Sequence, residues 1–168
     1  FEAPIDGCVF MRNGIIVPGK RMNLGAETPL NSIPSPILSG LMDKFFCLDV
    51  YPAIQTSRHC PYQCTFCVSG KNTGKLRIRD LDTVEREIRY IANAFSNEPY
   101  KPLYIIDENF GINKQDLQIA KMIVEIANEV GWPKKVMVYM NKKFNETTSG
   151  IIRTFGTMSE YGYWVPFQ

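Results

Sequence analysis

The sequence has little net charge, a single histidine and no long hydrophobic run, and these shortages exclude several classes of protein. A formal net charge of +2 over 168 residues is too small to indicate a nucleic-acid partner or an anionic membrane surface. No apolar stretch is long enough to cross a bilayer as a helix. We therefore expect a globular α/β or similar domain with no nucleic-acid partner and no membrane span.

Cysteine is also scarce, and its distribution is uneven. The chain has five cysteines, and three of them, Cys60, Cys64 and Cys67, follow the spacing C-x3-C-x2-C. An odd, clustered set favours a metal site in a reducing compartment over a disulfide framework. We therefore expect a cytoplasmic protein, in which Cys8 and Cys47 are small buried apolar residues rather than ligands.

The two ends of the chain indicate a piece of a longer protein. The sequence begins with Phe1 rather than methionine and stops at Gln168, inside a segment that resembles the start of a strand. We expect residues 1–32 to form one unit and residues 33–168 the first part of a domain.

Residues 1–32 are predicted to contain a hairpin and a linker. Asn13-Gly14 separates two apolar runs, and this dipeptide supplies the two positive φ angles of a tight hairpin turn. The stretch from Pro18 to Pro36 contains four prolines, which deny backbone donors and block helix formation. It therefore predicts an irregular connection.

From residue 33 on, apolar periodicity predicts alternating helices and strands. Asp82 is predicted to cap the helix over 82–95, because Glu85 follows it three residues later. Gly131 and Pro133 are predicted to end the helix over 114–130. The expected elements are a short helix over 37–46, a strand over 51–56, a helix over 82–95, a strand over 103–106, a helix over 114–130, a strand over 136–140, a helix over 146–155 and a last strand after 160.

This alternation predicts parallel βαβ units, as a (β/α) barrel or an open doubly wound sheet. In both architectures active sites lie at the carboxyl ends of the strands. The cysteine loop follows the first strand, and Asp107-Glu108-Asn109 follows the second. Two polar clusters are therefore expected at one rim of the sheet.

The cysteine triplet is compatible with two kinds of metal site. Thiolates bind zinc or an iron–sulfur cluster. A structural zinc site takes four ligands, and the sequence offers no second cysteine pair; His59 is so close to Cys60 that closing a tetrahedron would be awkward. Three thiolates on a 4Fe–4S cluster would leave one iron open for chemistry.

The motif Cys60-x-x-x-Cys64-x-Phe66-Cys67 resembles that of the radical S-adenosylmethionine superfamily. The segments 33–36, 51–58 and 107–111 are similar to the branch associated with a cobalamin-binding domain. In the superfamily the open iron binds S-adenosylmethionine, and an electron passed through the cluster releases a 5′-deoxyadenosyl radical. The resemblance implies a partial (β/α) barrel over 33–168, comprising its first three to four units, and a tail of an upstream cobalamin-binding domain over 1–32.

The resemblance also implies roles for named residues, although it assigns none to catalysis itself. Cys60, Cys64 and Cys67 would bind three irons, and Phe66 would pack against the cluster or the adenine. Asp107, Glu108 and Asn109 would contact S-adenosylmethionine, with helix entry, solvation or a turn as their alternative roles. Gln168 would be the first of the later residues that hold the nucleoside.

Two departures from the family pattern affect these roles. His59 stands where much of the branch has glycine, and Ile106-Asp107-Glu108-Asn109 stands where many members have Gly-Gly-Glu.

The implied reaction is methyl transfer, cyclisation or rearrangement of a small molecule that the sequence does not name. The implied cofactors are S-adenosylmethionine, a 4Fe–4S cluster and, in another domain, cobalamin.

An external one-electron donor of the flavodoxin or ferredoxin type is also expected. The alternatives are a methylthiotransferase-like or cobalamin-free radical enzyme, and a non-catalytic zinc or electron-transfer module.

Overall fold

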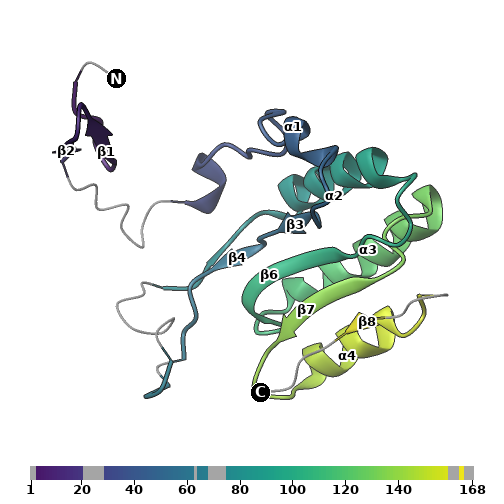
Figure 1. Cartoon of the computed structure of the whole chain (residues 1–168). Helices are drawn as coiled ribbons and strands as arrows, with labels where there is room; N and C mark the ends of the chain where they lie inside the picture. Colours follow the sequence, from purple (N-terminus) through teal and green to yellow (C-terminus); the bar gives the residue numbers. More distant parts are fainter. Residues whose placement is uncertain (1–2, 21–28, 63, 68–74, 159–162, 165–168) are drawn as a thin grey trace.

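The computed structural model describes residues 3–20, 29–62, 64–67, 75–158 and 163–164 (Figure 1). Its elements are β1 (Val9–Arg12), β2 (Ile15–Pro18), a 3-10 turn (Leu30–Ser32), α1 (Asp43–Phe46), β3 (Ala53–Ile54), β4 (Ser57–Arg58), β5 (Arg77–Ile78), α2 (Leu81–Phe95), β6 (Leu103–Phe110), α3 (Gln115–Val130), β7 (Val136–Met140), α4 (Glu146–Phe155) and β8 (Tyr163–Trp164). No helix among these is long and apolar enough to cross a membrane.

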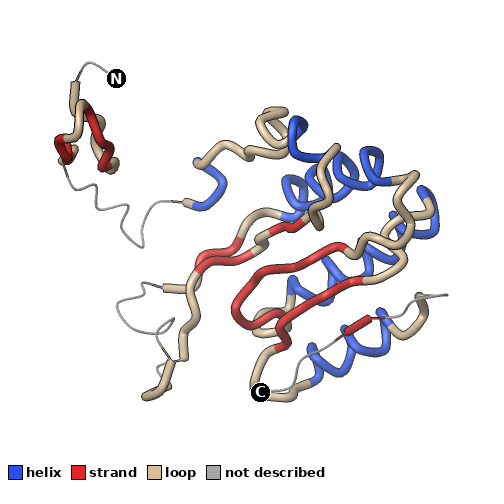
Figure 2. The backbone as a smooth tube through the Cα atoms, viewed as in Figure 1, coloured by secondary structure: helices blue, strands red, loops and turns tan. Residues whose placement is uncertain are grey.

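The central sheet has the order β3-β6-β7-β8, and each neighbouring pair is parallel. Helices α2, α3 and α4 connect these strands in turn (Figure 2). This arrangement confirms the predicted mixed α/β fold with a parallel sheet. The boundaries of β7 and α4 coincide with the predicted ones.

One face of the sheet carries the hydrophobic core. Leu103 and Ile105 of β6 and Val136 and Val138 of β7 are buried against the three long helices. Side chains of alternate residues point to the other face, where Ile106 and Tyr139 are exposed. The helices therefore cover one face, and the other remains uncovered in the part of the chain that the structure describes.

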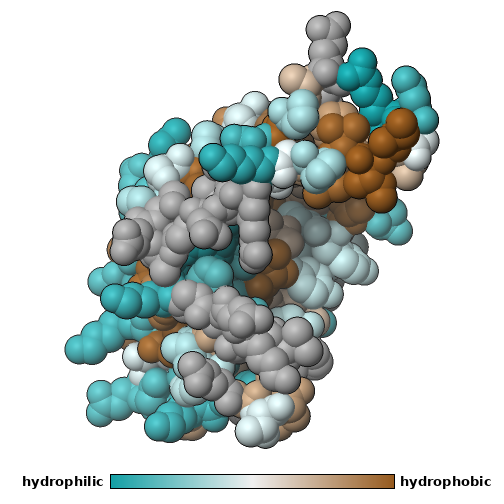
Figure 3. Space-filling model, turned by 90° about the vertical axis from the view of Figure 1, so that its left-hand side faces the viewer, coloured by the Kyte–Doolittle hydropathy of each residue, from teal (hydrophilic) through white to brown (hydrophobic). Residues whose placement is uncertain are grey.

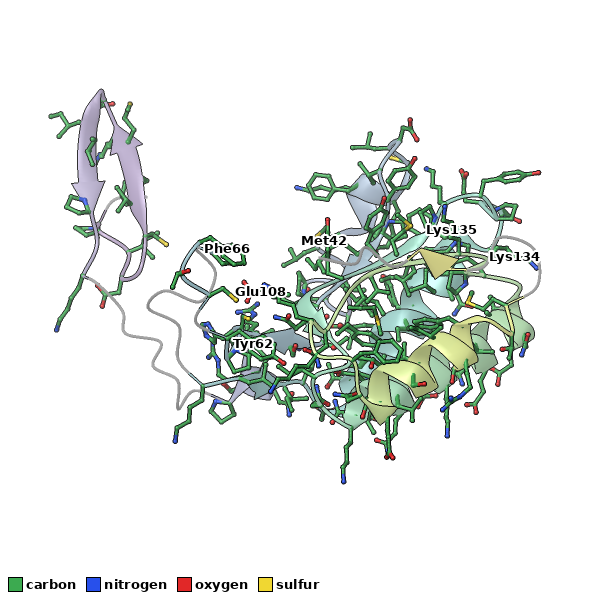
Figure 4. The ribbon with its side chains drawn as sticks, turned by 90° about the horizontal axis from the view of Figure 1, so that it is seen from below. Met42, Tyr62, Phe66, Glu108, Lys134 and Lys135 are labelled. Atoms are coloured by element: carbon green, nitrogen blue, oxygen red, sulfur yellow. The ribbon has the colours of Figure 1, made fainter. Side chains whose placement is uncertain are left out.

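The predicted hairpin is present. β1 and β2 pair antiparallel around Asn13 and Gly14, whose φ angles are 49° and 78°. Figures 1 and 4 show the hairpin apart from the sheet. Its apolar side chains are largely exposed: Val9, Met11, Ile15 and Ile16. Figure 3, viewed from the side on which the hairpin lies, shows hydrophobic residues gathered between hydrophilic ones.

Several sequence predictions were wrong in detail. Asp80 rather than Asp82 caps α2, because its side chain accepts a hydrogen bond from the Thr83 amide. Of the short helix expected over 37–46, the last four residues are α-helical. Cys8 and Cys47 are exposed, since Cys8 directly precedes the exposed hairpin and Cys47 directly follows α1, none of whose residues is buried.

The largest differences concern the strands next to the cysteine loop. β6 continues to Phe110, so Asp107, Glu108 and Asn109 lie inside the strand rather than after it. The strand expected over 51–56 is divided: β3 joins the central sheet, whereas β4 pairs antiparallel with β5 in a separate two-stranded ribbon.

Candidate functional site

The cysteine loop leaves the sheet at its carboxyl edge. β4 leads into it, and Figure 4 shows Tyr62, Phe66 and Glu108 near one another on the side of the molecule that carries this loop, with Lys134 and Lys135 at the opposite end of the sheet. Lys135 immediately precedes β7, so this opposite end is the amino edge. The loop therefore lies where parallel α/β folds place their active sites.

His59 begins the loop in a left-handed backbone conformation, with a φ of 73°. This conformation is most easily adopted by glycine, which much of the related branch has at this position. The Arg77 side chain on β5 lies 3.0 Å from His59 Nε2. Because a guanidinium has no acceptor, Arg77 donates and His59 Nε2 accepts. The contact joins the start of the loop to the β4–β5 ribbon.

Polar groups from two strand ends approach two of the cysteine sulfurs. Cys60 is 5% exposed, and Asn109 on β6 donates from Nδ2 to its Sγ over 2.8 Å. Lys142, two residues beyond β7, places Nζ 3.7 Å from Cys64 Sγ. Cys64 and Cys67 are half-buried, and the Cys67 amide donates to the Cys64 carbonyl over 3.1 Å. Both side-chain donors would stabilise negative charge on thiolate sulfur.

The cysteine loop offers a thiolate donor set for an iron–sulfur cluster. Across the described residues, no three His, Cys, Asp or Glu side chains are placed to hold one metal ion. Three cysteines on one loop, two of them approached by hydrogen-bond donors, match the thiolate chemistry of such a cluster.

Asp107 is held by the fold rather than presented to a ligand. It is completely buried. The Thr56 amide donates to Oδ1 over 2.7 Å, and the Thr56 and Ser57 hydroxyls donate to Oδ2 over 2.5 and 2.8 Å. Burial raises the pKa of Asp107, although these hydrogen bonds oppose the rise. The carboxylate therefore ties β6 to the segment that enters the cysteine loop.

The other predicted cofactor residues are placed differently. Glu108 is exposed, on the uncovered face of the sheet. Asn109 is buried and contacts Cys60, as described above. Phe66 is 85% exposed, with Lys142 Nζ 5.7 Å from its ring centre. Gln168 lies outside the described residues.

A second buried carboxylate lies beneath the turn that follows β6. Asp116 accepts hydrogen bonds from the amides of Gly111 and Asn113 and from the Asn113 side chain. Burial is the main cause that raises its pKa to about 6, and the nearby Asp107 adds to the rise. The group holds this turn in place and contacts no cysteine.

Sequence reasoning missed two contacts of the loop. Lys142 approaches Cys64, and Asn141 accepts a hydrogen bond from the Tyr62 hydroxyl over 2.9 Å. Both residues directly follow β7. Their place at the carboxyl end of a predicted parallel strand was the available signal, because such ends share one rim with the loop.

No protein-family model matches the chain. Two curated relatives are 32% identical to it: 2-(S-pantetheinyl)-carbapenam-3-carboxylate methyltransferase of Streptantibioticus cattleyicolor and the cobalamin-dependent radical SAM methyltransferase TokK of Streptomyces tokunonensis. The matches cover 82% and 83% of this chain, and 20% and 22% of the relatives. The chain thus spans about a fifth of the length of these relatives.

The fold is similar to a solved structure of a cobalamin-dependent S-adenosylmethionine radical enzyme, OxsB, with a TM-score of 0.53 and 18% identity. The match covers 95% of this chain and 23% of OxsB. At this identity it supports the fold alone. The two sequence relatives, 32% identical over more than four fifths of this chain, show that it is a member of the radical S-adenosylmethionine superfamily and resembles its cobalamin-associated branch.

Proposed function

We propose that the complete protein binds a 4Fe–4S cluster through Cys60, Cys64 and Cys67 and uses it with S-adenosylmethionine for methyl transfer. When bound, the cluster and S-adenosylmethionine supply one-electron cleavage of the sulfonium and hydrogen abstraction from a substrate. The observation that carries the proposal is the cysteine loop at the carboxyl edge of the sheet, with Asn109 and Lys142 directed at the sulfurs of Cys60 and Cys64.

The uncovered face of the sheet would become the inside of a partial (β/α) barrel. Four parallel strands with all three long helices on one side are the first units that such a barrel needs. Residues 33–168 would then be the first part of the radical S-adenosylmethionine domain. Residues 1–32, with their exposed apolar hairpin, would be the tail of an upstream cobalamin-binding domain.

Two side chains are well placed to meet S-adenosylmethionine. Glu108 lies on the uncovered face at the carboxyl end of β6, where its carboxylate can accept from the amino group. Phe66 is exposed next to Cys67, where its ring can cover the cluster or stack on the adenine. Gln168 is proposed as a nucleoside contact from the family resemblance alone. Asp107 is not proposed as a ligand, because its oxygens already accept hydrogen bonds from Thr56 and Ser57.

The names of the two curated relatives favour methyl transfer over cyclisation or rearrangement, since both are methyltransferases and one is cobalamin-dependent. Cobalamin, held by another domain, is the methyl carrier that this proposal requires. An external one-electron donor of the flavodoxin or ferredoxin type would reduce the cluster. The substrate would be a small molecule.

Anaerobic reconstitution of the complete protein tests the proposal. We expect about four irons and four sulfides per chain, an electron paramagnetic resonance signal after reduction, and 5′-deoxyadenosine formed from S-adenosylmethionine. Binding of zinc without iron uptake would contradict the proposal. Iron uptake without any cleavage of S-adenosylmethionine would favour an electron-transfer module instead.

A matched pair of cysteine variants locates the cluster. Cys64→Ala is expected to lose the cluster, whereas Cys47→Ala, at an exposed cysteine outside the loop, is expected to keep its full iron content. Equal iron in both variants would place the cluster elsewhere.

A further inference from the structure

We propose that Asn109 is a positioning residue that raises the reduction potential of the cluster through its hydrogen bond to Cys60. The inference rests on the proposed function, because it requires Cys60 to be a cluster ligand. In this proposal the side-chain amide of Asn109, on β6, holds the Cys60 sulfur in position and stabilises the reduced form of the cluster.

The geometry of the contact supports this assignment. Asn109 Nδ2 lies 2.8 Å from Cys60 Sγ, and both residues are 5% exposed. The amide nitrogen rather than the amide oxygen faces the sulfur, because a thiolate accepts hydrogen bonds and the oxygen would repel it. The contact joins residues 49 positions apart, so it attaches the first cysteine of the loop to the rigid sheet.

The oxygen of the same side-chain amide, Oδ1, indicates that folding alone does not explain an asparagine at position 109. Asn109 Oδ1 is buried and has no hydrogen-bond partner within the described residues. A buried, unpaired acceptor destabilises a fold, and an apolar residue of similar size would avoid that loss. The contact of the amide nitrogen with the Cys60 sulfur offsets this loss.

The direction of the effect follows from electrostatics. Reduction adds one negative charge to the cluster and its thiolates, and a donor aimed at a ligand sulfur stabilises the more negative state. Hydrogen bonds to the sulfurs are among the factors that set cluster potentials. Because this contact is buried, the low local dielectric strengthens it. Losing the donor therefore makes the cluster harder to reduce.

Lys142 does not provide an equivalent contact. Its Nζ lies 3.7 Å from Cys64 Sγ in an exposed environment, where water and salt screen its charge. The shorter, buried contact of Asn109 is expected to have the larger effect on the potential.

The test is a redox titration of the reconstituted complete protein, followed by electron paramagnetic resonance. Asn109→Leu removes the donor and fills its space, whereas Asn109→Ala removes it and leaves a void. Asn109→Gln keeps an amide donor. The control is Asn128→Leu, which makes the same replacement at an exposed asparagine near the carboxyl end of α3.

We expect Asn109→Leu and Asn109→Ala to lower the equilibrium constant for one-electron reduction roughly tenfold, a shift of about −59 mV. Asn109→Gln should recover part of the shift, and Asn128→Leu should match the unmodified protein. The inference is overturned if both donor-free variants keep the original potential, or if Asn128→Leu shifts it as far. Failure of the proposed function is distinguishable, because it shows in the unmodified protein as a missing cluster or as no cleavage of S-adenosylmethionine, whereas failure of this inference shows only in the comparison of potentials.

Discussion

Asp107 is fully buried, and its two carboxylate oxygens accept three hydrogen bonds from Thr56 and Ser57. These bonds join β6 to the residues between β3 and β4. A sequence of three polar residues after an apolar run predicts a loop, whereas here the strand continues through all three. The hydroxyls that satisfy Asp107 come from residues 50 and 51 positions earlier, so no local pattern reveals them.

Replacing Asp107 with alanine tests this structural role. Asp107→Ala leaves the Thr56 amide and two hydroxyls without their acceptor, and we expect the free energy of unfolding to fall by roughly 3 kcal/mol. Urea denaturation followed by circular dichroism measures the change. Glu108→Ala, at the adjacent exposed position, should change the value by less than about 0.5 kcal/mol. An equal loss in both variants would contradict the assignment.

Asp116 predicts a pH dependence of stability. Its pKa in the folded protein is about 6, above its ordinary value of 3.8. The folded state therefore binds the proton more tightly than the unfolded state, and stability that is present below pH 3.8 is lost as the pH rises through about 6. A rise of about two pKa units corresponds to roughly 3 kcal/mol.

The measurement compares denaturation midpoints of the unmodified protein and Asp116→Asn between pH 4 and pH 7. The uncharged amide keeps the shape of the side chain and an acceptor for the Gly111 amide, so the variant should lose less stability over this range. Burial also raises the pKa of Asp107. Because Asp107 raises the pKa of Asp116 by charge repulsion, the difference between the two pH profiles includes the loss of this interaction. Parallel pH profiles would show that Asp116 does not titrate in this window.

At the scale of elements, the first turn of α2 shows where the sequence misleads. Asp80 and Asp82 both precede the apolar repeat, and the capping-box pattern favoured Asp82 because Glu85 follows it. In the structure Asp80 Oδ1 accepts from the Thr83 amide over 2.8 Å, and Oδ2 accepts from the Thr83 hydroxyl. The N-cap therefore lies two residues earlier than predicted.

Alanine substitutions distinguish the two aspartates. Asp80→Ala should lower the free energy of unfolding by about 1 kcal/mol, the usual value of an N-cap. Asp82→Ala should cost about 0.3 kcal/mol, because an exposed acidic residue in the first turn interacts weakly with the helix dipole. Hydrogen bonding to Thr83 lowers the pKa of Asp80, so its contribution should disappear as the pH falls below about 4. A larger loss of stability for Asp82→Ala than for Asp80→Ala would support Asp82 as the N-cap of α2.

The remaining elements show which sequence patterns are sufficient to predict the bounds of a helix or strand. β7 and α4 were predicted to the residue, because a short apolar run and a helical apolar repeat each have one consistent interpretation. Asn145 caps α4 with a capping box. The β4–β5 ribbon was not predicted. Its strands contain Ser57, Arg58 and Arg77, and neither has an apolar alternation that would indicate pairing.

At the scale of the molecule, the parallel order of the sheet and the position of the cysteine loop followed from the sequence, because alternating βα units allow few arrangements. The contacts of Asn109 and Lys142 with sulfur did not. They join residues 49 and 78 positions apart and depend on how far β6 and β7 extend. The uncovered face of the sheet, with Ile106 and Tyr139 exposed, is the face that the proposed barrel would enclose.

A charge on that face tests whether the barrel closes over it. Ile106 is 48% exposed in this chain, so lysine would be tolerated if the face stayed open. In a closed barrel the ammonium would be buried beside Glu108, at a site shaped for a cofactor, and we expect Ile106→Lys to lower the free energy of unfolding of the complete protein by at least 2 kcal/mol. Leu41→Lys, at a leucine 67% exposed, is the control and should change it by less than about 0.5 kcal/mol. If both variants unfold at the urea concentration of the unmodified protein, the uncovered face remains open to solvent and the barrel proposal is wrong.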